Sequence, residues 1–453
     1  SIHLIDLKKK CKVKAIDIGE YEYVPRLQWS EKSNKLILQS MNRHQNSLKY
    51  HLVDCTDGKT STKIIFEETS ETYIDVDDNL IFLEDGESLL RTSEMHGYKH
   101  IYKLDFSGEH KQVTNGNWDV IDFLGLDDEN NTIYYSSCEP HSTQKSVYSI
   151  NINGSNKKEI SQNLGYNDAE FLKGMKYFIH TYSNANTPPT ISLRSNDGSL
   201  ISVLQDNSRL KNKLKEYPKL NEKIISSIDL GYTQLNTSMI LPQDFDSTKK
   251  YPVYFNVYGG PGHNEVLDSY DGGDYMYHQL LAQEGYIVFT IDPRGTMYRG
   301  AEFKKSTYLE LGKLEIEDII NAAIKLREYS WVDSDRIGIM GWSYGGFMAS
   351  LAITKGADVF KTAIAVAPVT NWRYYDNIYT ERFMRTPQEN ASGYDENSPI
   401  NHVDKMKGNY LLIHGSADDN VHYQNTMEMI NAMVEADKQF DLFIYPNKNH
   451  GIY

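Results

Sequence analysis

Residues 336–352 read RIGIMGWSYGGFMASLA, and this stretch decides the fold of the C-terminal half of the chain. The apolar run at 336–340 is typical of a buried parallel strand, and the small residues at 346–352 predict a helix. Between them lies the pattern G-x-S-x-G, with Ser343 at its centre. In this context the serine is held on a sharp strand-to-helix turn with its hydroxyl exposed. Glycines flank it because side chains would clash in the turn, and the helix N-terminus adds oriented backbone N–H groups.

Similar apolar runs recur through this half and alternate with helical patterns. Two positions, 315–326 and 425–436, have the spacing of amphipathic helices. The runs are typical of buried strands and lie at 254–258, 286–291, 362–366, 410–414 and 442–445. Alternating strand and helix predict an open, doubly wound, mostly parallel sheet with helices on its faces, which with the serine turn is the α/β-hydrolase fold.

A serine hydroxyl needs a base, and the base needs an orienting acid. In α/β hydrolases the chain order is Ser, then Asp, then His. Asp418 follows the strand at 410–414, and His450 follows the strand at 442–445. Asp418 lies 75 residues after Ser343, and His450 lies 32 residues after Asp418. Three other histidines compete for the role of base: His414, His422 and His263. His414 ends a strand, as structural histidines more often do, and His422 lies among candidates for the substrate side. The loop position of His450 fits the base better.

The stretch YGGPG at 258–262 follows an early strand. In a hydrolase such a loop supplies part of the oxyanion hole. The second donor is then the backbone N–H of Tyr344, and Tyr258 can donate its phenolic hydroxyl. The alternative is that Tyr258 merely ends the strand while the glycines form a turn.

The first 205 residues have a different texture, with short alternating strands separated by turn residues. Four similar units each begin with an aromatic residue, and these aromatics are 53, 41 and 48 residues apart: Trp29, Phe82, Phe123 and Phe171. That is the ~40–50-residue period of propeller blades. A later turn in each unit closes a hairpin because glycine accepts positive φ: Asp57-Gly58, Ser107-Gly108, Asn153-Gly154 and Asp197-Gly198. The alternative is a pair of β-sandwich sheets.

We therefore expect an all-β propeller domain at 1–205 and an α/β-hydrolase catalytic domain at 206–453. The boundary falls in the lysine-rich, polar segment 206–225, which contains Pro218. Four blades are few for a closed propeller, and the chain opens inside a strand pattern at 2–5. We expect earlier blades, and a closing segment after His450, to belong to a longer protein.

Composition restricts the function further. With 47 basic and 62 acidic residues the net charge is −15, which argues against a nucleic-acid partner and favours cationic over anionic substrates. No apolar stretch approaches the ~18 residues that cross a bilayer. The three cysteines (Cys11, Cys55 and Cys138) have neither disulfide-framework nor metal spacing. Nucleophilic catalysis by a serine needs no metal or cofactor, so we expect neither.

Four segments together resemble the prolyl oligopeptidase family, and within it the dipeptidyl peptidase IV branch. They are GWSYGGF at 341–347, GSADDNVH at 415–422, NHG at 449–451 and APVTNWRYYDNIYTER at 367–382. The likeness spans most of residues 225–453 and is looser over the blades.

The resemblance implies roles for individual residues. Ser343 is then the nucleophile, Asp418 the acid and His450 the base, with Asp419 the less favoured acid. Tyr258 matches the oxyanion tyrosine of the family, and Asn420 matches a side chain that binds a substrate carbonyl. Six further residues match the pocket that receives the substrate residue before the scissile bond: Tyr344, Val369, Trp372, Tyr375, Tyr379 and Val421.

An aromatic slot suits a proline ring, which is compact and apolar. The spacing of Tyr375 and Tyr379 fits a core stripe on a helix equally well. The glutamates with which the family grips a free N-terminus precede this chain, and Glu67-Glu68 lies too late to replace them.

The resemblance implies a serine exopeptidase that releases N-terminal dipeptides with proline, or less readily alanine, in the second position. It implies peptide substrates, a homodimer in many members, and a periplasmic, secreted or cell-surface location. The alternatives are an acylaminoacyl peptidase, tripeptidyl peptidase or esterase of the same fold, or a catalytically silent propeller protein that binds peptides.

Overall fold

A computed structural model of the chain describes residues 2–7, 11–30, 33–56, 60–217 and 220–453. The turn predicted at Asp57-Gly58 and the position of Pro218 lie outside the described residues. By packing, the chain divides into two compact units. One comprises 1–135 with 149–158, and the other comprises 136–148 with 159–453.

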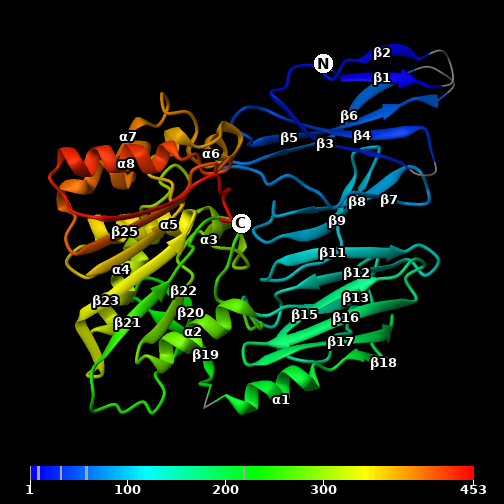
Figure 1. The fold of residues 1–453 in the computed structure, drawn as a ribbon. Coiled ribbons are helices and arrows are strands. Elements are labelled where there is room, and N and C mark those ends of the chain that lie inside the picture. Colours follow the sequence, from blue (N-terminus) through cyan, green and yellow to red (C-terminus); the bar gives the residue numbers. More distant parts are fainter. Residues whose placement is uncertain (1, 8–10, 31–32, 57–59, 218–219) are drawn as a thin grey trace. The chain divides into compact units, whose positions relative to one another are not determined.

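The N-terminal half contains four antiparallel four-stranded sheets, each formed by strands consecutive in the chain (Figure 1). The first is β3 (Tyr23–Trp29), β4 (Lys35–Met41), β5 (Ser47–Asp54) and β6 (Ser61–Thr69). The second is β7 (Ile81–Phe82), β8 (Ser88–Ser93), β9 (His100–Asp105) and β10 (His110–Gln112). The third is β11 (Val120–Asp127), β12 (Thr132–Ser137), β13 (Ser146–Asn151) and β14 (Lys158–Glu159). The fourth is β15 (Tyr166–Phe171), β16 (Tyr177–Asn184), β17 (Thr187–Ser195) and β18 (Leu200–Gln205), and a hairpin of β1 (Ile2–Asp6) and β2 (Lys12–Ile16) precedes them all.

The predicted repeat is confirmed, with one sheet for each unit. Each leading aromatic lies in the first strand of its sheet, at Trp29, Phe82, Phe123 and Phe171. Three of the predicted turns have glycines with positive φ: 99° at Gly108, 87° at Gly154 and 92° at Gly198. Four strands per sheet is the form of a propeller blade, and the larger sheets of a sandwich do not form among the described residues.

The inner strands of these sheets carry the core. β4 is buried along almost its whole length and β8 along all of it. Ile37 and Tyr50 from the first sheet pack in one cluster with Leu89 and Leu104 from the second. The two strands are buried on both faces but are only partly apolar: β8 also buries Arg91 and Thr92, and both of these side chains are hydrogen-bonded.

A short helix, α1 (Ser208–Glu216), follows the fourth sheet and buries none of its side chains. The polar segment predicted at 206–225 is therefore partly helical, and its end already belongs to β19 (Lys223–Asp229). The domain boundary at residue 205 stays a prediction, since the two compact units divide the chain earlier.

An eight-stranded sheet organises the C-terminal half, in the order β19-β20-β22-β21-β23-β24-β25-β26. The hairpin of β19 and β20 (Gln234–Ile240) was not predicted. Its two strands are antiparallel, and β20 is also antiparallel to β22, whereas the remaining neighbours from β22 to β26 are parallel. The parallel strands are β21 (Tyr251–Asn256), β22 (Ile287–Ile291), β23 (Val332–Trp342), β24 (Thr362–Val366), β25 (Asn409–Gly415) and β26 (Asp441–Tyr445).

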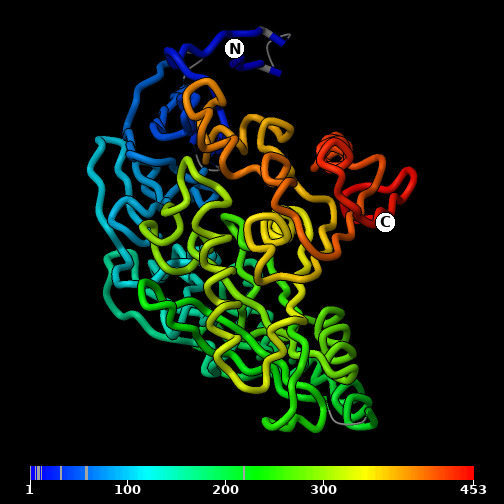
Figure 2. Tube along the Cα trace, turned by 90° about the vertical axis from the view of Figure 1, so that its left-hand side faces the viewer, coloured from blue at the N-terminus to red at the C-terminus, as the bar shows by residue number. Residues whose placement is uncertain are grey.

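Helices connect these strands, as the alternating pattern predicts. They are α2 (Gly273–Gln283), α3 (Gly300–Lys305), α4 (Leu314–Leu326), α5 (Tyr344–Thr354), α6 (Asn377–Met384), α7 (Ala391–Glu396) and α8 (Gln424–Glu435). Two 3₁₀ helices, η2 (Trp372–Tyr374) and η3 (Pro399–Lys405), complete the set. The red end of the tube in Figure 2 is the segment from α8 to the C-terminus.

Within the described ranges, every helix is too short or too polar to cross a membrane. The carboxyl ends of the parallel strands lie at one edge of the sheet, where ligands bind in open α/β sheets. The predicted nucleophile, acid, base and oxyanion loop each follow one of these strands.

Candidate active site

The turn around Ser343 has the strain that the G-x-S-x-G pattern predicts. β23 ends at Trp342 and α5 begins at Tyr344, and Ser343 between them has φ 59° and ψ −114°. Such a conformation is unfavourable for a residue with a side chain, and it persists only where surrounding packing enforces it. A Cβ on Gly341 would lie 2.3 Å from the backbone of Gly345, and one on Gly345 would lie 2.2 Å from the carbonyl oxygen of Val257. Both glycines are therefore required for the turn.

The predicted acid and base are hydrogen-bonded to each other. His450 Nδ1 lies 2.7 Å from Asp418 Oδ2. The Asp418 carboxylate is buried, and its Oδ1 accepts the backbone N–H of Asn420 at 2.9 Å. Because Nδ1 donates to a carboxylate, Nε2 of His450 is left free to act as a base. The neighbouring Asp419 is exposed, in agreement with its lower rank as the acid.

A tryptophan joins the base to the serine turn. Trp342 Nε1 donates to the carbonyl oxygen of His450 at 3.1 Å. The residue that precedes Ser343 therefore holds the backbone of His450 from 108 positions away. No hydrogen bond joins the Ser343 hydroxyl to the His450 ring, both of which are described, and catalytic contacts of this kind commonly tighten only when substrate binds.

The competing histidines have different surroundings. His422 is exposed. The His263 ring lies 4.6 Å from the Tyr258 ring, centroid to centroid, and its Nε2 is 3.0 Å from Glu265. His414 is the last residue but one of β25; its side chain is fully buried, and its Nε2 lies 3.1 Å from Asp418 Oδ2.

Tyr258 lies in the loop after β21 and faces the serine turn. Its ring is 6.0 Å from the ring of Tyr344, and a Cβ on Gly260 would lie 2.7 Å from the Tyr344 ring and 2.8 Å from the Tyr258 ring. Gly260 thus permits the approach of the two tyrosines. Burial, and then the charge of Glu265, raise the pKa of Tyr258. Its hydroxyl therefore keeps its proton and remains a hydrogen-bond donor.

The predicted pocket residues form one aromatic cluster. Trp372 of η2 lies 5.4 Å from Tyr344 and 5.9 Å from both Tyr375 and Tyr379, measured between ring centroids. Tyr375 and Tyr379 meet edge to face at 5.1 Å. The side chain of Asp376 caps α6 by accepting the N–H of Tyr379 at 2.9 Å, which orients this tyrosine.

The cluster has both a core side and an open side. Trp372, Val369 and Val421 are buried, whereas Tyr375 and Tyr379 are only partly buried. The hydroxyl of Tyr375 donates to Asn420 Oδ1 at 2.5 Å, so the predicted carbonyl-binding residue adjoins the aromatic wall. A stripe that served only the core would not leave these polar atoms at the surface.

Sequence reasoning missed one carboxylate beside this cluster. Glu315, in the first turn of α4, accepts the hydroxyl of Tyr344 at 2.7 Å and the N–H of Gly312 at 3.0 Å. Burial raises its pKa to about 7. The sequence did contain a sign of this residue: Glu315 lies four residues before Ile319 and seven before Ala322, so a carboxylate stands on the apolar stripe of α4.

Glu67-Glu68 does not offer a free acidic pair. Glu68 is buried and forms an ion pair with Arg91, whose guanidinium also lies 3.7 Å from Asp77. Glu67 accepts the hydroxyl of Ser47 at 2.8 Å. The prediction that this pair does not bind a substrate N-terminus is compatible with these contacts.

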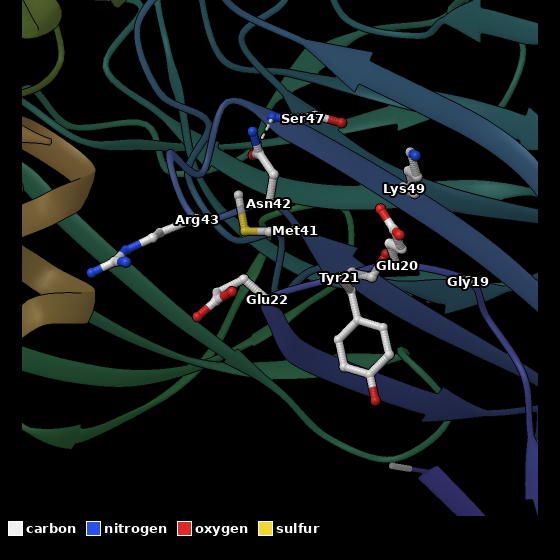
Figure 3. Close-up of a pocket in the computed structure, with 10 residues that line it drawn as sticks. Gly19, Glu20, Tyr21, Glu22, Met41, Asn42, Arg43, Ser47 and Lys49 are labelled. Carbon is white, nitrogen blue, oxygen red and sulfur yellow. Dashed lines mark hydrogen bonds between the residues drawn. The ribbon is translucent and has the colours of Figure 1, made fainter. Parts of the chain in front are cut away.

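A separate cavity of about 600 Å³ lies in the first unit and contains none of the predicted site residues (Figure 3). Its charged side chains have both signs, with Glu20 and Glu22 opposite in sign to Arg43 and Lys49. Asn42 Oδ1 accepts the backbone N–H of Ser47 at 3.1 Å across one wall. The Ser40 hydroxyl on its wall is bonded to His51 Nε2 at 2.8 Å, and the cavity contains neither Ser343 nor the Asp418–His450 pair.

The parallel sheet, the strained serine after β23 and the Asp–His pair after β25 and β26 define a serine hydrolase of the α/β-hydrolase class. Comparison with known families is more specific. The profile of the prolyl oligopeptidase family matches residues 274–453, and that of the dipeptidyl peptidase IV (DPP IV) N-terminal region matches residues 1–189. The chain belongs to the prolyl oligopeptidase family.

Individual relatives agree with this assignment. The crystal structure of Porphyromonas gingivalis dipeptidyl peptidase 4 is similar with a TM-score of 0.94 and 39% identity, covering 100% of this chain and 64% of that one. A putative dipeptidyl aminopeptidase IV from Bacteroides ovatus has a TM-score of 0.87 and 28% identity, covering 97% and 65%. A probable dipeptidyl-aminopeptidase B of Pyrenophora teres f. teres is 35% identical over 95% of this chain and 49% of its own. The chain spans about half the length of the curated relatives it matches.

Proposed function

We propose that the protein is a serine exopeptidase that removes dipeptides from peptide N-termini, with proline, and less readily alanine, in the second position. The observation that carries the proposal is the Asp418–His450 pair, held by Trp342 against the strained turn of Ser343. The relatives named as dipeptidyl peptidases support the choice of reaction.

In the proposed mechanism Ser343 Oγ attacks the carbonyl carbon of the second residue while His450 Nε2 takes its proton. Asp418 stabilises the imidazolium that forms. The backbone N–H of Tyr344 and the hydroxyl of Tyr258 donate to the oxyanion, and His450 then protonates the leaving amine. Water hydrolyses the acyl-enzyme by the same route, again with His450 as the base.

The aromatic cluster accounts for the preference for proline. Trp372, Tyr375, Tyr379 and the Tyr344 ring form flat apolar walls, which suit a compact ring without a backbone N–H. Asn420 is then placed to bind a substrate carbonyl, next to the hydroxyl of Tyr375.

The experiment compares three amide substrates: Gly-Pro, Ala-Ala-Pro and N-blocked Gly-Pro. We expect hydrolysis of the first alone, and none by Ser343→Ala. Cleavage of the blocked substrate would remove the dipeptidase proposal and leave an acylaminoacyl peptidase. Faster turnover of esters than of Gly-Pro amides would favour an esterase, and failure of a fluorophosphonate to label Ser343 would favour the catalytically silent protein.

We also propose an extracytoplasmic location and a homodimer, each supported by family resemblance alone. Fractionation of the native cells tests the location, and light scattering of the purified protein tests the dimer.

A further inference from the structure

The carboxylate of Asp418 lies within hydrogen-bonding distance of two histidine rings, although a catalytic triad requires only one. His450 Nδ1 lies 2.7 Å from Oδ2, and His414 Nε2 lies 3.1 Å from the same oxygen. The side chains of His414 and Asp418 are both completely buried. The second histidine therefore contacts the acid where solvent does not compete.

The neighbours of His414 determine which ring nitrogen carries the proton. Nε2 also lies 2.9 Å from the carbonyl oxygen of Val421, which can only accept. Nε2 must therefore be the N–H, shared between this carbonyl and Asp418 Oδ2. Nδ1 then accepts the hydroxyl of Thr426, 2.7 Å away.

Burial keeps His414 neutral, against the pull of the acceptors that face it. Asp418, the His450 ring and the edge-to-face ring of Tyr423 are the titratable groups around it. Burial lowers the pKa of His414 and outweighs the hydrogen bond to the Val421 carbonyl and the attraction of Asp418, which both raise it. A neutral ring with a single N–H has one fixed donor direction.

We propose that His414 is a positioning residue: its Nε2–H holds the Asp418 carboxylate in the orientation that receives His450, and ties the same loop to the pocket wall at Val421. The inference rests on the proposed function, because it assigns Asp418 the role of the acid. His414 does not touch substrate. It acts through Asp418, whose second oxygen is held by the N–H of Asn420.

The test compares His414→Phe, which keeps the ring and its burial but has no donor, with His414→Gln, whose amide restores an N–H. We expect His414→Phe to lower kcat for Gly-Pro amides by about 10²-fold, as a small misplacement of a catalytic group does, with little change in KM. The acidic limb of kcat/KM moves to higher pH, because Asp418 without this donor attracts the proton on His450 more strongly. His414→Gln restores most of the rate and returns the limb toward its wild-type position.

A histidine that only filled the core would not move the pH profile. His180→Phe is the matched control, since His180 is also buried and bonded through Nε2, to Asn167 at 3.0 Å. We expect it to lose stability and keep the wild-type limb. A folded His414→Phe enzyme with wild-type kcat and pH profile overturns the inference, as does a His414→Gln enzyme no better than His414→Phe.

If His414→Phe does not fold, Thr426→Val tests the inference instead, because it removes the hydroxyl that donates to His414 Nδ1. We expect a smaller shift of the acidic limb in the same direction, and a wild-type profile overturns the inference. Asp418→Asn is measured in parallel. Full activity of Asp418→Asn, or an inactive wild type, contradicts the proposed function, whereas an inactive Asp418→Asn beside an unaffected His414→Phe contradicts only this inference.

Discussion

The proposed role of Tyr258 in the reaction depends on a single atom, its phenolic oxygen. Its ring packs against Tyr344 and His263, while its hydroxyl is the proposed oxyanion donor. Tyr258→Phe removes the donor and keeps the ring. We expect kcat to fall by about 10²–10³-fold, the loss typical of one oxyanion donor, with a smaller effect on KM.

Steady-state kinetics with Gly-Pro amide measures this effect. Tyr329→Phe is a suitable control, because Tyr329 is 48% exposed. Wild-type kcat in Tyr258→Phe would exclude the phenol from the oxyanion hole.

Glu315 makes stability depend on pH. Burial raises its pKa from 4.5 to about 7, so the folded protein binds a proton that the unfolded chain releases between these values. The stabilisation from this group is fully present below pH 4.5 and is lost as pH rises to about 7. A shift of this size corresponds to about 3 kcal/mol.

We therefore expect the stability of Glu315→Gln relative to wild type to increase by up to about 3 kcal/mol between pH 4.5 and pH 8. Urea unfolding at several pH values measures the difference. Glu317→Gln, exposed on the same helix, should show no such trend. A pH-independent difference for Glu315→Gln would mean that Glu315 titrates normally.

At the scale of elements, the turn between β23 and α5 forms only because Gly345 has no side chain, so that neighbouring backbone can pack against it. A Cβ on Gly345 would meet the carbonyl oxygen of Val257 at 2.2 Å, a backbone atom that cannot move aside cheaply. Gly338, within β23, has its nearest neighbour at an ordinary 3.5 Å. The two glycines lie on either side of Ser343 in the same strand–turn–helix unit.

Gly345→Ala should therefore displace α5 or the loop before Tyr258, and abolish labelling of Ser343 by a fluorophosphonate. Gly338→Ala should be labelled at close to the wild-type rate. Thermal unfolding separates loss of the turn from loss of the fold. Normal labelling of Gly345→Ala would show that the turn tolerates a side chain.

For the whole molecule, the fourth blade packs with the hydrolase sheet in the second compact unit. Asn186 exchanges two hydrogen bonds with the backbone of Lys223 in β19, at 3.0 and 2.8 Å. The N–H of Ala185 donates to Asp268 at 2.9 Å. A boundary at residue 205 would divide these hydrogen-bonded segments between two domains, although it does separate the all-β pattern of the sequence from the α/β pattern.

We expect hydrogen exchange in increasing denaturant to expose the amides of β15–β18 together with those of β19–β26. The strands of the first sheet, β3–β6, serve as the comparison because they belong to the other unit. Exposure of β15–β18 together with β3–β6, before the hydrolase sheet, would instead support the boundary at residue 205.

Local patterns alone predicted much of this protein. The G-x-S-x-G stretch, the apolar runs of β21–β25 and the four aromatic-led units are properties of neighbouring residues, and strand and turn preferences act over that range. The order Ser343, Asp418, His450 was predictable because connections in an open α/β sheet place successive strand ends at one edge.

Only the tertiary structure revealed which side chains touch across distant segments. The partnership of His414 with Asp418, the bond from Trp342 to His450 and the burial of Glu315 under Tyr344 leave no periodic trace in the chain. The last two contacts depend on packing between elements that are 108 and 29 residues apart. His414 and Asp418 are only four residues apart, but the path of the loop after β25 decides whether their side chains meet. A polar side chain on an apolar stripe does not reveal its partner. Patterns therefore located the reactive groups, and three-dimensional packing decided what orients them.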